Sequence, residues 1–151
     1  TNLFGPPELV QVQDRFLDSH LIHTTLRGEL VRSKSEVIIA NLLHSKGLDY
    51  QYEAPLRSLQ GEVRYPDFTI VDDASGVTFY WEHLGMLSDA GYRRRWKEKL
   101  AWYGDQGILS YEEGGGPGGT LLVSEDDPEG GIDSKAIEEL VDHMLLGNSG
   151  Y

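Results

Sequence analysis

Two acidic residues have the types and spacing needed to hold a divalent cation. Asp67 lies in the run RYPDFTIV and Glu82 in the run GVTFYWEHLG, and both runs are rich in β-forming residues. If Asp72 pairs with Val77 across the turn between them, Asp67 lies directly opposite Glu82, with Cβ atoms ~4.5–5.5 Å apart. Like charges at that distance repel each other, and a cation such as Mg²⁺, which binds one or two carboxylates, offsets the repulsion.

A third acid comes from the helix that precedes these strands. Glu36 shares a helical face with Ile39 and Leu43, so we expect it to turn toward the sheet. Each acid also has a structural interpretation, which the sequence leaves open. Glu36 can complete a capping box with Ser33, Asp67 can be a turn acid after proline, and Glu82 can be a neutral, hydrogen-bonded core acid.

The helix after the strand that carries Glu82 supplies a lysine that can reach these acids. One of its faces carries Tyr92, Trp96, Lys99 and Tyr103, at helical spacing. Because an aromatic face packs on a sheet, Lys99 is predicted to point inward and Lys97 to point elsewhere. The alternative is that the Lys99 stem covers apolar surface while its ammonium group reaches water.

The elements that position these residues follow from hydrophobic periodicity and end signals. SKSE predicts a helix start at Ser33, and Gly47 predicts its end. Three β-rich runs follow, then a helix from about Asp89 to Gln106, a short buried strand in TLLVSED and a final amphipathic helix. The expected fold class is α/β: a central mixed β-sheet flanked by helices, in the order αβββαβ plus a C-terminal helix.

The length fits a single domain, which we expect to be part of a longer protein. Helical periodicity predicts an N-terminal helical extension over residues 1–32, followed by a core over residues 33–125. Residues 126–151 are predicted to form an acidic C-terminal helix. His20 and His23 are one helical turn apart in this scheme, but no third ligand accompanies them, so we do not expect a metal site there.

The formal net charge of −12 is unevenly distributed. Residues 104–151 contain 11 acidic and 1 basic residue, whereas residues 51–103 contain 8 acidic and 7 basic residues. The middle of the chain is therefore nearly neutral and does not exclude a polyanionic partner. The chain has no cysteine, no long apolar run and no signal-peptide pattern at its start, so we expect a cytoplasmic protein without a membrane partner.

Together these motifs resemble the PD-(D/E)XK nuclease superfamily. Glu36 in a first helix, PDF in the second strand and WEH in the third match its restriction-endonuclease-like core, over residues 33 to about 125. The resemblance implies metal-dependent phosphodiester hydrolysis, with Mg²⁺ or Mn²⁺ bound by Asp67, Glu82 and the backbone carbonyl of His83. Glu36 would act directly or through water.

The sequence departs from the superfamily at its lysine. That lysine normally follows the second acid by two residues, where this chain has Leu84. Some members supply the lysine from the following helix, which makes Lys99 the expected catalytic lysine. EHLGM, Tyr92 and Lys99 also resemble nuclease domains of bacterial helicase-type and DNA-repair proteins, so the resemblance implies a DNA substrate and a helicase or ATPase domain in the same protein.

Basic residues near the acids are candidates for phosphate contacts: Arg64, Arg93, Arg94, Arg95 and Lys97. A solvated helix face is the alternative for the run on the second helix, and pairing with Glu62 is the alternative for Arg64. Two other functions remain open. One is a catalytically inactive nuclease-like module that binds nucleic acid or acts as a scaffold, and the other is an α/β domain in which the acids are structural.

Overall fold

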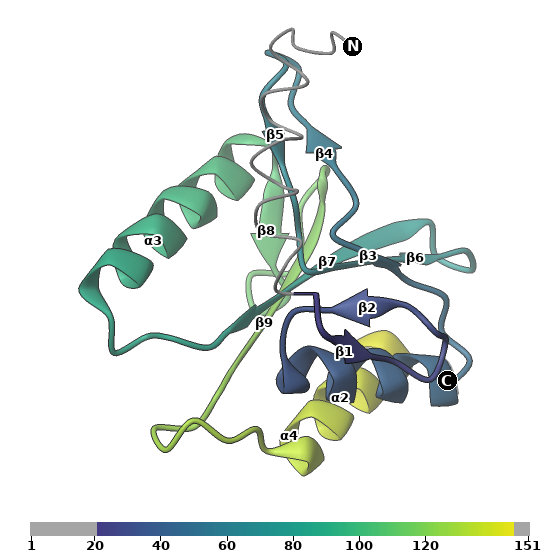
Figure 1. Cartoon of the computed structure of the whole chain (residues 1–151). Coiled ribbons are helices and arrows are strands. Elements are labelled where there is room, and N and C mark those ends of the chain that lie inside the picture. Colours follow the sequence, from purple (N-terminus) through teal and green to yellow (C-terminus); the bar gives the residue numbers. More distant parts are fainter. Residues whose placement is uncertain (1–20, 147–151) are drawn as a thin grey trace, which may run out of the picture.

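The computed structural model describes residues 21–146, and its centre is a five-stranded mixed sheet (Figure 1). The strand order is β3 (Gln51–Tyr52), β6 (Phe68–Asp72), β7 (Val77–Leu84), β9 (Gly119–Glu125) and β8 (Ile108–Ser110). The pairs β3·β6 and β6·β7 are antiparallel, whereas β7·β9 and β8·β9 are parallel. The expected α/β class with a central mixed sheet is therefore confirmed.

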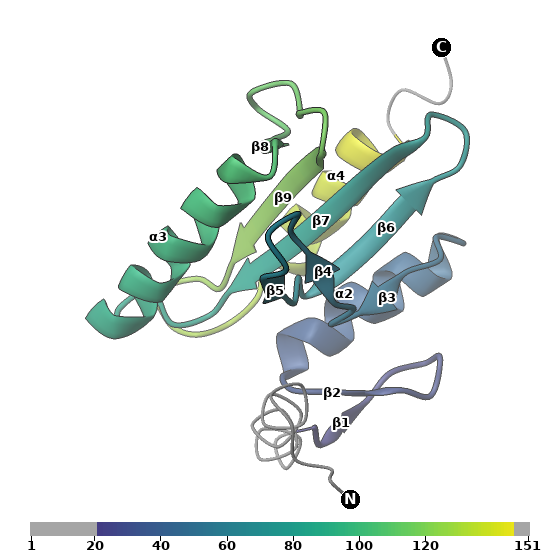
Figure 2. The same cartoon turned by 90° about the horizontal axis from the view of Figure 1, so that it is seen from above.

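Helices cover both faces of this sheet, as Figure 2 shows. Helix α3 (Ala90–Asp105) lies on one face, and α2 (Lys34–Ser45) and α4 (Ser134–Leu140) lie on the other. Side chains of β7 alternate between the two faces. Phe79 and Trp81 belong to the core under α2 and α4, and Tyr80 packs against the smaller core under α3. The same alternation turns Glu82 toward α3.

The predicted register of the central hairpin is confirmed. Asp72 pairs with Val77, and the ladder continues to the pair Phe68 and Trp81. Gly76 adopts a φ of 76° and donates its N–H to the Asp72 carbonyl over 2.7 Å, which closes the turn. Asp67 follows directly in this register and lies across from Glu82, just beyond the last paired residue of β6.

Both long helices begin and end where the sequence predicts. The Ser33 side chain caps α2 by accepting the Glu36 N–H, and the Asp89 side chain caps α3 by accepting two backbone N–H groups. Gly47 and Gly107 follow the two helices with φ values of 75° and 73°, a conformation that glycine adopts without strain. These caps fix where each helix starts relative to the sheet.

The expected helical extension is wrong for the part of it that the structure describes. Strands β1 (His23–Thr24) and β2 (Leu30–Val31) form a short antiparallel hairpin beside α2. The turn between them closes through a Gly28 N–H bond to the Thr25 carbonyl, and Gly28 has a φ of 96°. Residues 1–20, the rest of the expected extension, lie outside the described residues.

Three further elements were not predicted. Strands β4 (Leu56–Arg57) and β5 (Val63–Arg64) form a projecting hairpin, and β8 adds an edge strand to the sheet. The final helix starts at Ser134 rather than at residue 126, and it continues into a π-helical turn, η1 (Val141–Leu146). Residues 147–151 of the expected helix lie outside the described residues.

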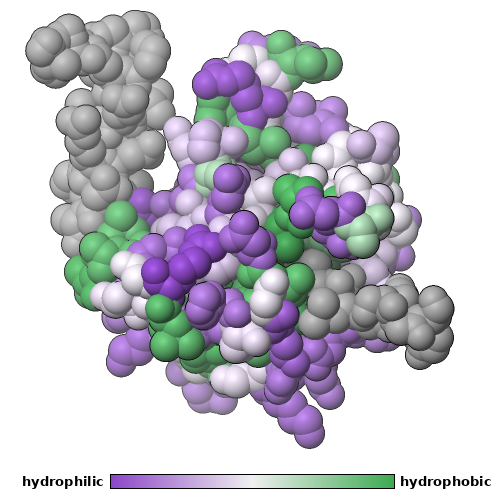
Figure 3. All heavy atoms as spheres, turned by 90° about the vertical axis from the view of Figure 1, so that its right-hand side faces the viewer, coloured by the Kyte–Doolittle hydropathy of each residue, from purple (hydrophilic) through white to green (hydrophobic). Residues whose placement is uncertain are grey.

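The face of the molecule shown in Figure 3 is mixed in character, with hydrophobic residues in small separate groups among hydrophilic ones. Exposed hydrophobic residues of the described chain include Ile22, Leu26 and Val71. Among the described helices, none combines the length and apolar character that spanning a membrane requires.

Candidate functional site

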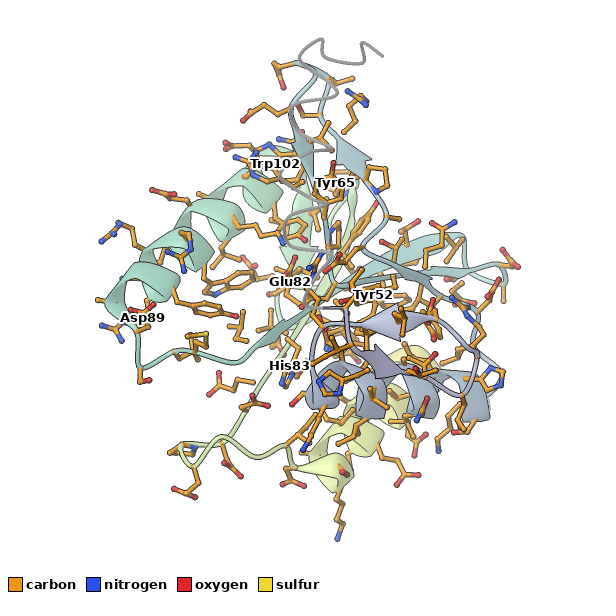
Figure 4. All side chains as sticks on the ribbon, viewed as in Figure 1. Tyr52, Tyr65, Glu82, His83, Asp89 and Trp102 are labelled. Carbon is orange, nitrogen blue, oxygen red and sulfur yellow. The ribbon has the colours of Figure 1, made fainter. Side chains whose placement is uncertain are left out.

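A cavity of about 540 Å³ lies where β7 ends, between α3 and the start of α2. Figure 4 shows Glu82 near the centre of the molecule, between α3 and the region of β1, β2 and α2. Side chains from both helices and from three strand ends line this cavity. Its charged lining residues include Glu36, Asp67, Glu82, Arg95, Lys99 and Asp126.

Asp67 and Glu82 form the acidic floor of the cavity. Asp67 Oδ2 accepts the backbone N–H of His83 over 2.7 Å. Glu82 is buried, and its Oε2 lies 2.7 Å from Lys99 Nζ and accepts the Tyr103 hydroxyl hydrogen. The second oxygen of each carboxylate accepts no hydrogen bond from the described residues. The two carboxylates therefore have one oxygen each left for a ligand.

The backbone of His83 faces the same side as Asp67. Alternate residues of a strand direct their N–H and C=O groups to opposite neighbouring strands. The Leu84 carbonyl accepts from Asp126, which follows β9, so the backbone groups of His83 point the other way, toward the start of β6. The His83 N–H bond to Asp67 agrees with this direction. Its carbonyl therefore lies on the same side of β7 as Asp67.

Lys99 occupies the position that helical spacing predicted. Its Nζ is 2.7 Å from Glu82 Oε2 and donates to the Tyr65 carbonyl over 2.9 Å. Lys97 is exposed on another face of α3. Lys99 therefore lies beside Glu82, because α3 packs its aromatic face on the sheet.

Glu36 points into the same cavity and is buried. Its Oε1 accepts the Arg32 N–H over 3.0 Å and the Tyr52 hydroxyl hydrogen over 2.9 Å. The capping box is only half formed, because Glu36 reaches back to Arg32 rather than to the N–H of Ser33. Glu36 thus combines a local capping contact with a position near the other two acids.

Sequence reasoning missed several neighbours of these acids. Arg32 lines the cavity and forms an ion pair with Glu53, with Nε 2.7 Å from Oε2. Tyr52 and Tyr103 donate to Glu36 and Glu82. Helical spacing places Tyr103 on the inner face of α3, but spacing alone does not give the contact of its hydroxyl group with Glu82.

Burial raises the pKa of all three carboxyl groups. For Asp67, burial raises the pKa well above its ordinary value, and the nearby carboxylates of Glu82 and Glu36 raise it further. Burial also raises the pKa of Glu82, although Lys99 and Tyr103 act in the opposite direction. Burial raises the pKa of Glu36 against the hydrogen bond from Tyr52. Burial therefore favours the neutral form of each of these acids.

These pKa shifts predict how stability depends on pH. An acid with a raised pKa in the folded state stabilises the fold fully below its ordinary pKa, which is 3.8 for Asp67, and loses that contribution as the pH rises through the raised value. Replacing Asp67 with Asn removes this loss. We expect the free energy of unfolding of D67N, relative to the original chain, to increase from pH 5 to pH 8, by at most about 1.4 kcal/mol per pH unit.

Denaturant unfolding of both chains in the presence of a chelator measures this difference. Titrating groups far from the site are common to the two chains and cancel, so the difference reports Asp67 together with Glu82 and Glu36, whose titration is coupled to it. An equal pH dependence in both chains would contradict the raised pKa of Asp67.

The His83 side chain lies on the face of the sheet opposite to that of Glu82. Its Nδ1 is 2.8 Å from Ser124 Oγ, and its Nε2 is 2.7 Å from Asp126 Oδ1. Ser35 Oγ also donates to Asp126 Oδ1 over 2.8 Å. This buried network ties the ends of β7 and β9 to the start of α2. It therefore holds the backbone of His83, and with it Asp67, in place; sequence reasoning did not identify Asp126.

The basic candidates are divided between the cavity and the exposed surface. Arg95 lines the cavity, and Arg95, Arg64 and Lys99 also line a second hollow of about 330 Å³. Arg64 pairs with Glu62 at 3.5 Å, as one of its two interpretations expected. Arg93 Nη1 donates to the Leu87 carbonyl over 2.6 Å, and Arg94 is exposed, like Lys97.

The two histidines of the N-terminal segment do not form a helical pair within the described residues. His23 lies in strand β1, and His20 lies outside the described residues. Strand geometry at His23 removes the one-turn helical spacing on which a shared site would depend.

Comparison with known proteins finds similarity over half of the chain. A segment of 75 residues, 50% of the chain, is 43% identical to "Uncharacterized protein MJ1519" of Methanocaldococcus jannaschii. That segment is only 6% of the length of the archaeal protein. No family model matches the chain, and no solved structure matches it significantly.

Proposed function

We propose that this chain is a metal-dependent nuclease domain that hydrolyses phosphodiester bonds, with DNA as its substrate. The observation that carries the proposal is the contact between Lys99 and Glu82 in a cavity shared with Asp67 and Glu36. The order of α2, the β6–β7 hairpin, α3 and β9 further supports a restriction-endonuclease-like core of the PD-(D/E)XK type.

The donor set fits Mg²⁺ or Mn²⁺. Asp67 and Glu82 would hold the ion together with the His83 carbonyl, and Glu36 would contribute through water. Residues 21–146 contain no cluster of three or more His, Asp or Glu side chains able to enclose a metal alone. Two carboxylates suffice for Mg²⁺, which keeps several water ligands, and bound positive charge would relieve the repulsion that raises the pKa of Asp67.

The residues around the carboxylates supply the rest of the chemistry. A bound divalent ion would lower the pKa of a water molecule and neutralise charge on the phosphate. Lys99 has three N–H donors, of which described residues take two, so the third can orient water or bind a phosphate oxygen. Tyr103 and Tyr65 fix Glu82 and Lys99 in this arrangement.

Hydrolysis forms one bond between the water oxygen and phosphorus and breaks one bond between phosphorus and a sugar oxygen. The products are a phosphate end and a hydroxyl end, with the sugar oxygen taking up a proton. Lys99 can stabilise the extra negative charge that develops on the phosphate oxygens as the new bond forms. A preformed ammonium beside the carboxylates therefore has a direct role in the reaction.

We further propose that the domain works within a longer DNA-processing or DNA-repair protein in the cytoplasm, with a helicase or ATPase domain as its partner. The similarity to a short segment of a much longer archaeal protein supports only a place within a longer protein. The partner rests on the resemblance of EHLGM, Tyr92 and Lys99 to helicase-associated nuclease domains.

Incubation of the purified chain with circular single-stranded DNA, linear duplex DNA and RNA tests the proposal. We expect cleavage of a DNA substrate in Mg²⁺ or Mn²⁺ and none with excess chelator. Binding of Mn²⁺ and DNA without any cleavage would favour the inactive nuclease-like module instead. Absence of both binding and cleavage would favour structural roles for the acids.

A further inference from the structure

The cavity has an apolar wall that a metal and a phosphate alone do not require. Tyr92 and Trp96 lie about one turn apart on α3, and both line the cavity. Leu84 and Met86, from the end of β7 and the loop after it, complete this wall. Met86 is 57% exposed, and both rings are half-buried. The cavity therefore suits a ligand with one anionic part and one flat apolar part.

The aromatic wall is held in a fixed position. The Gly85 N–H donates to the Tyr92 hydroxyl oxygen over 3.1 Å, which ties the start of α3 to the end of β7. Trp96 packs against the core cluster that contains Trp102 and Tyr103. Figure 4 shows Asp89 at the start of this helix and Trp102 near its end, so the wall lies on the part of α3 between them. Preformed rings bind a planar group at a low cost in side-chain entropy.

The size of the cavity fits a single nucleotide. Its volume of about 540 Å³ falls within the range of roughly 300–1,000 Å³ typical of pockets for small molecules. A stacked base pair inside a duplex cannot turn one base into such a pocket without unpairing. An unpaired nucleotide can place its base against the rings and its phosphate beside the carboxylates.

Basic residues line both the cavity and the second hollow next to it. Arg95 lines the cavity and also lines the second hollow, together with Arg64 and Lys99. The Arg64 guanidinium carbon lies 5.4 Å from the centroid of the Trp102 ring, which holds it over the end of α3. Phosphate contacts by such residues position a strand without reading its sequence. The two hollows share Arg95 and Lys99, so a single strand can contact both.

From these observations we infer that the cavity binds an unpaired nucleotide of a DNA strand, with its base stacked on Trp96 and Tyr92. The substrates are then single-stranded DNA and the single-stranded ends or flaps of duplexes, rather than fully paired DNA. This inference rests on the proposed nuclease function and specifies its substrate. The stacking is independent of base identity, because every base has an aromatic face.

Binding of oligonucleotides carrying 2-aminopurine tests the inference, with the original chain and Ca²⁺ in place of Mg²⁺, so that the carboxylates keep a divalent ion while the DNA stays intact. We expect the single strand to bind at least about tenfold more tightly than a blunt duplex and its fluorescence to be quenched on binding. Adding Trp96→Leu should weaken single-strand binding by roughly tenfold, because Leu keeps apolar packing but has no ring. Trp96→Phe should retain most of the affinity, and the exposed Leu100→Ala on the same helix should change nothing.

Equal affinity for blunt duplex and single strand, or unchanged binding in Trp96→Leu, would overturn the inference. Free dTMP binding as tightly as the oligonucleotide would also overturn it, because the site would then serve a mononucleotide. A failure of the proposed nuclease function would give a different experimental result. In that case the chain with Asp67 intact would bind single strands through Trp96 but would cut no substrate in Mg²⁺ or Mn²⁺.

Discussion

Replacing Asp67 with asparagine is expected to lower metal-dependent DNA cleavage by roughly 10³-fold or more while leaving the fold intact. Asn keeps an oxygen that can accept the His83 N–H, so the local backbone contact at 2.7 Å should survive. What the variant loses is one of two carboxylates on the floor of the cavity. Initial rates of cleavage at saturating Mg²⁺ measure the effect, and circular dichroism measures the fold.

Asp73→Asn is the matched control for this change. Asp73 is exposed in the turn of the same hairpin, six residues away from Asp67, and lies outside the cavity. It should cleave at the rate of the original chain. Retained cleavage in D67N, or equal losses in both variants, would remove Asp67 from the site. Glu82→Gln should behave like D67N, because Glu82 is the other carboxylate of the pair.

Replacing Lys99 with alanine is expected to lower the rate of cleavage by about 10²–10³-fold, whereas Lys97→Ala should leave it nearly unchanged. Only Lys99 places its ammonium group 2.7 Å from Glu82. Single-turnover cleavage of one DNA substrate by the two variants measures this difference. Both variants lose one positive charge from the same helix, so a general electrostatic effect on DNA binding should be similar in the two.

The variant Lys99→Met distinguishes a role of the Lys99 charge in cleavage from a role of its side-chain stem in packing. Met keeps an unbranched stem that can cover the same apolar surface, and it removes the charge. We expect Lys99→Met to be as slow as Lys99→Ala while unfolding at a temperature closer to that of the original chain. A larger loss in Lys97→Ala than in Lys99→Ala would contradict the assignment of the lysine to α3.

Local patterns were sufficient to predict the centre of the site. One turn, between Asp72 and Val77, fixes the β6–β7 register, and that register determines that Asp67 faces Glu82. In α3, the aromatic residues identify the inner face, and helical geometry then orients Lys99. Both inferences need only the side-chain periodicity of the strand or helix and the residue at which that element begins or ends. The sequence gives both.

Contacts between distant segments could not be predicted in this way. The bond from Ser35 to Asp126 joins residues 91 positions apart, and no local pattern connects them. Strands β1, β2, β4 and β5 have two residues each, too few for an alternating pattern to appear. Strand β8 follows Gly107 so closely that its three residues resemble a continuation of the loop.

Titration of Mn²⁺ into the purified chain by calorimetry tests most directly whether the carboxylates form the metal site on which the proposed hydrolysis depends. We predict one bound ion per chain, with binding lost or strongly weakened in D67N and in Glu82→Gln but retained in Asp73→Asn. Absence of binding in the original chain, or binding that persists unchanged in D67N, would contradict this site.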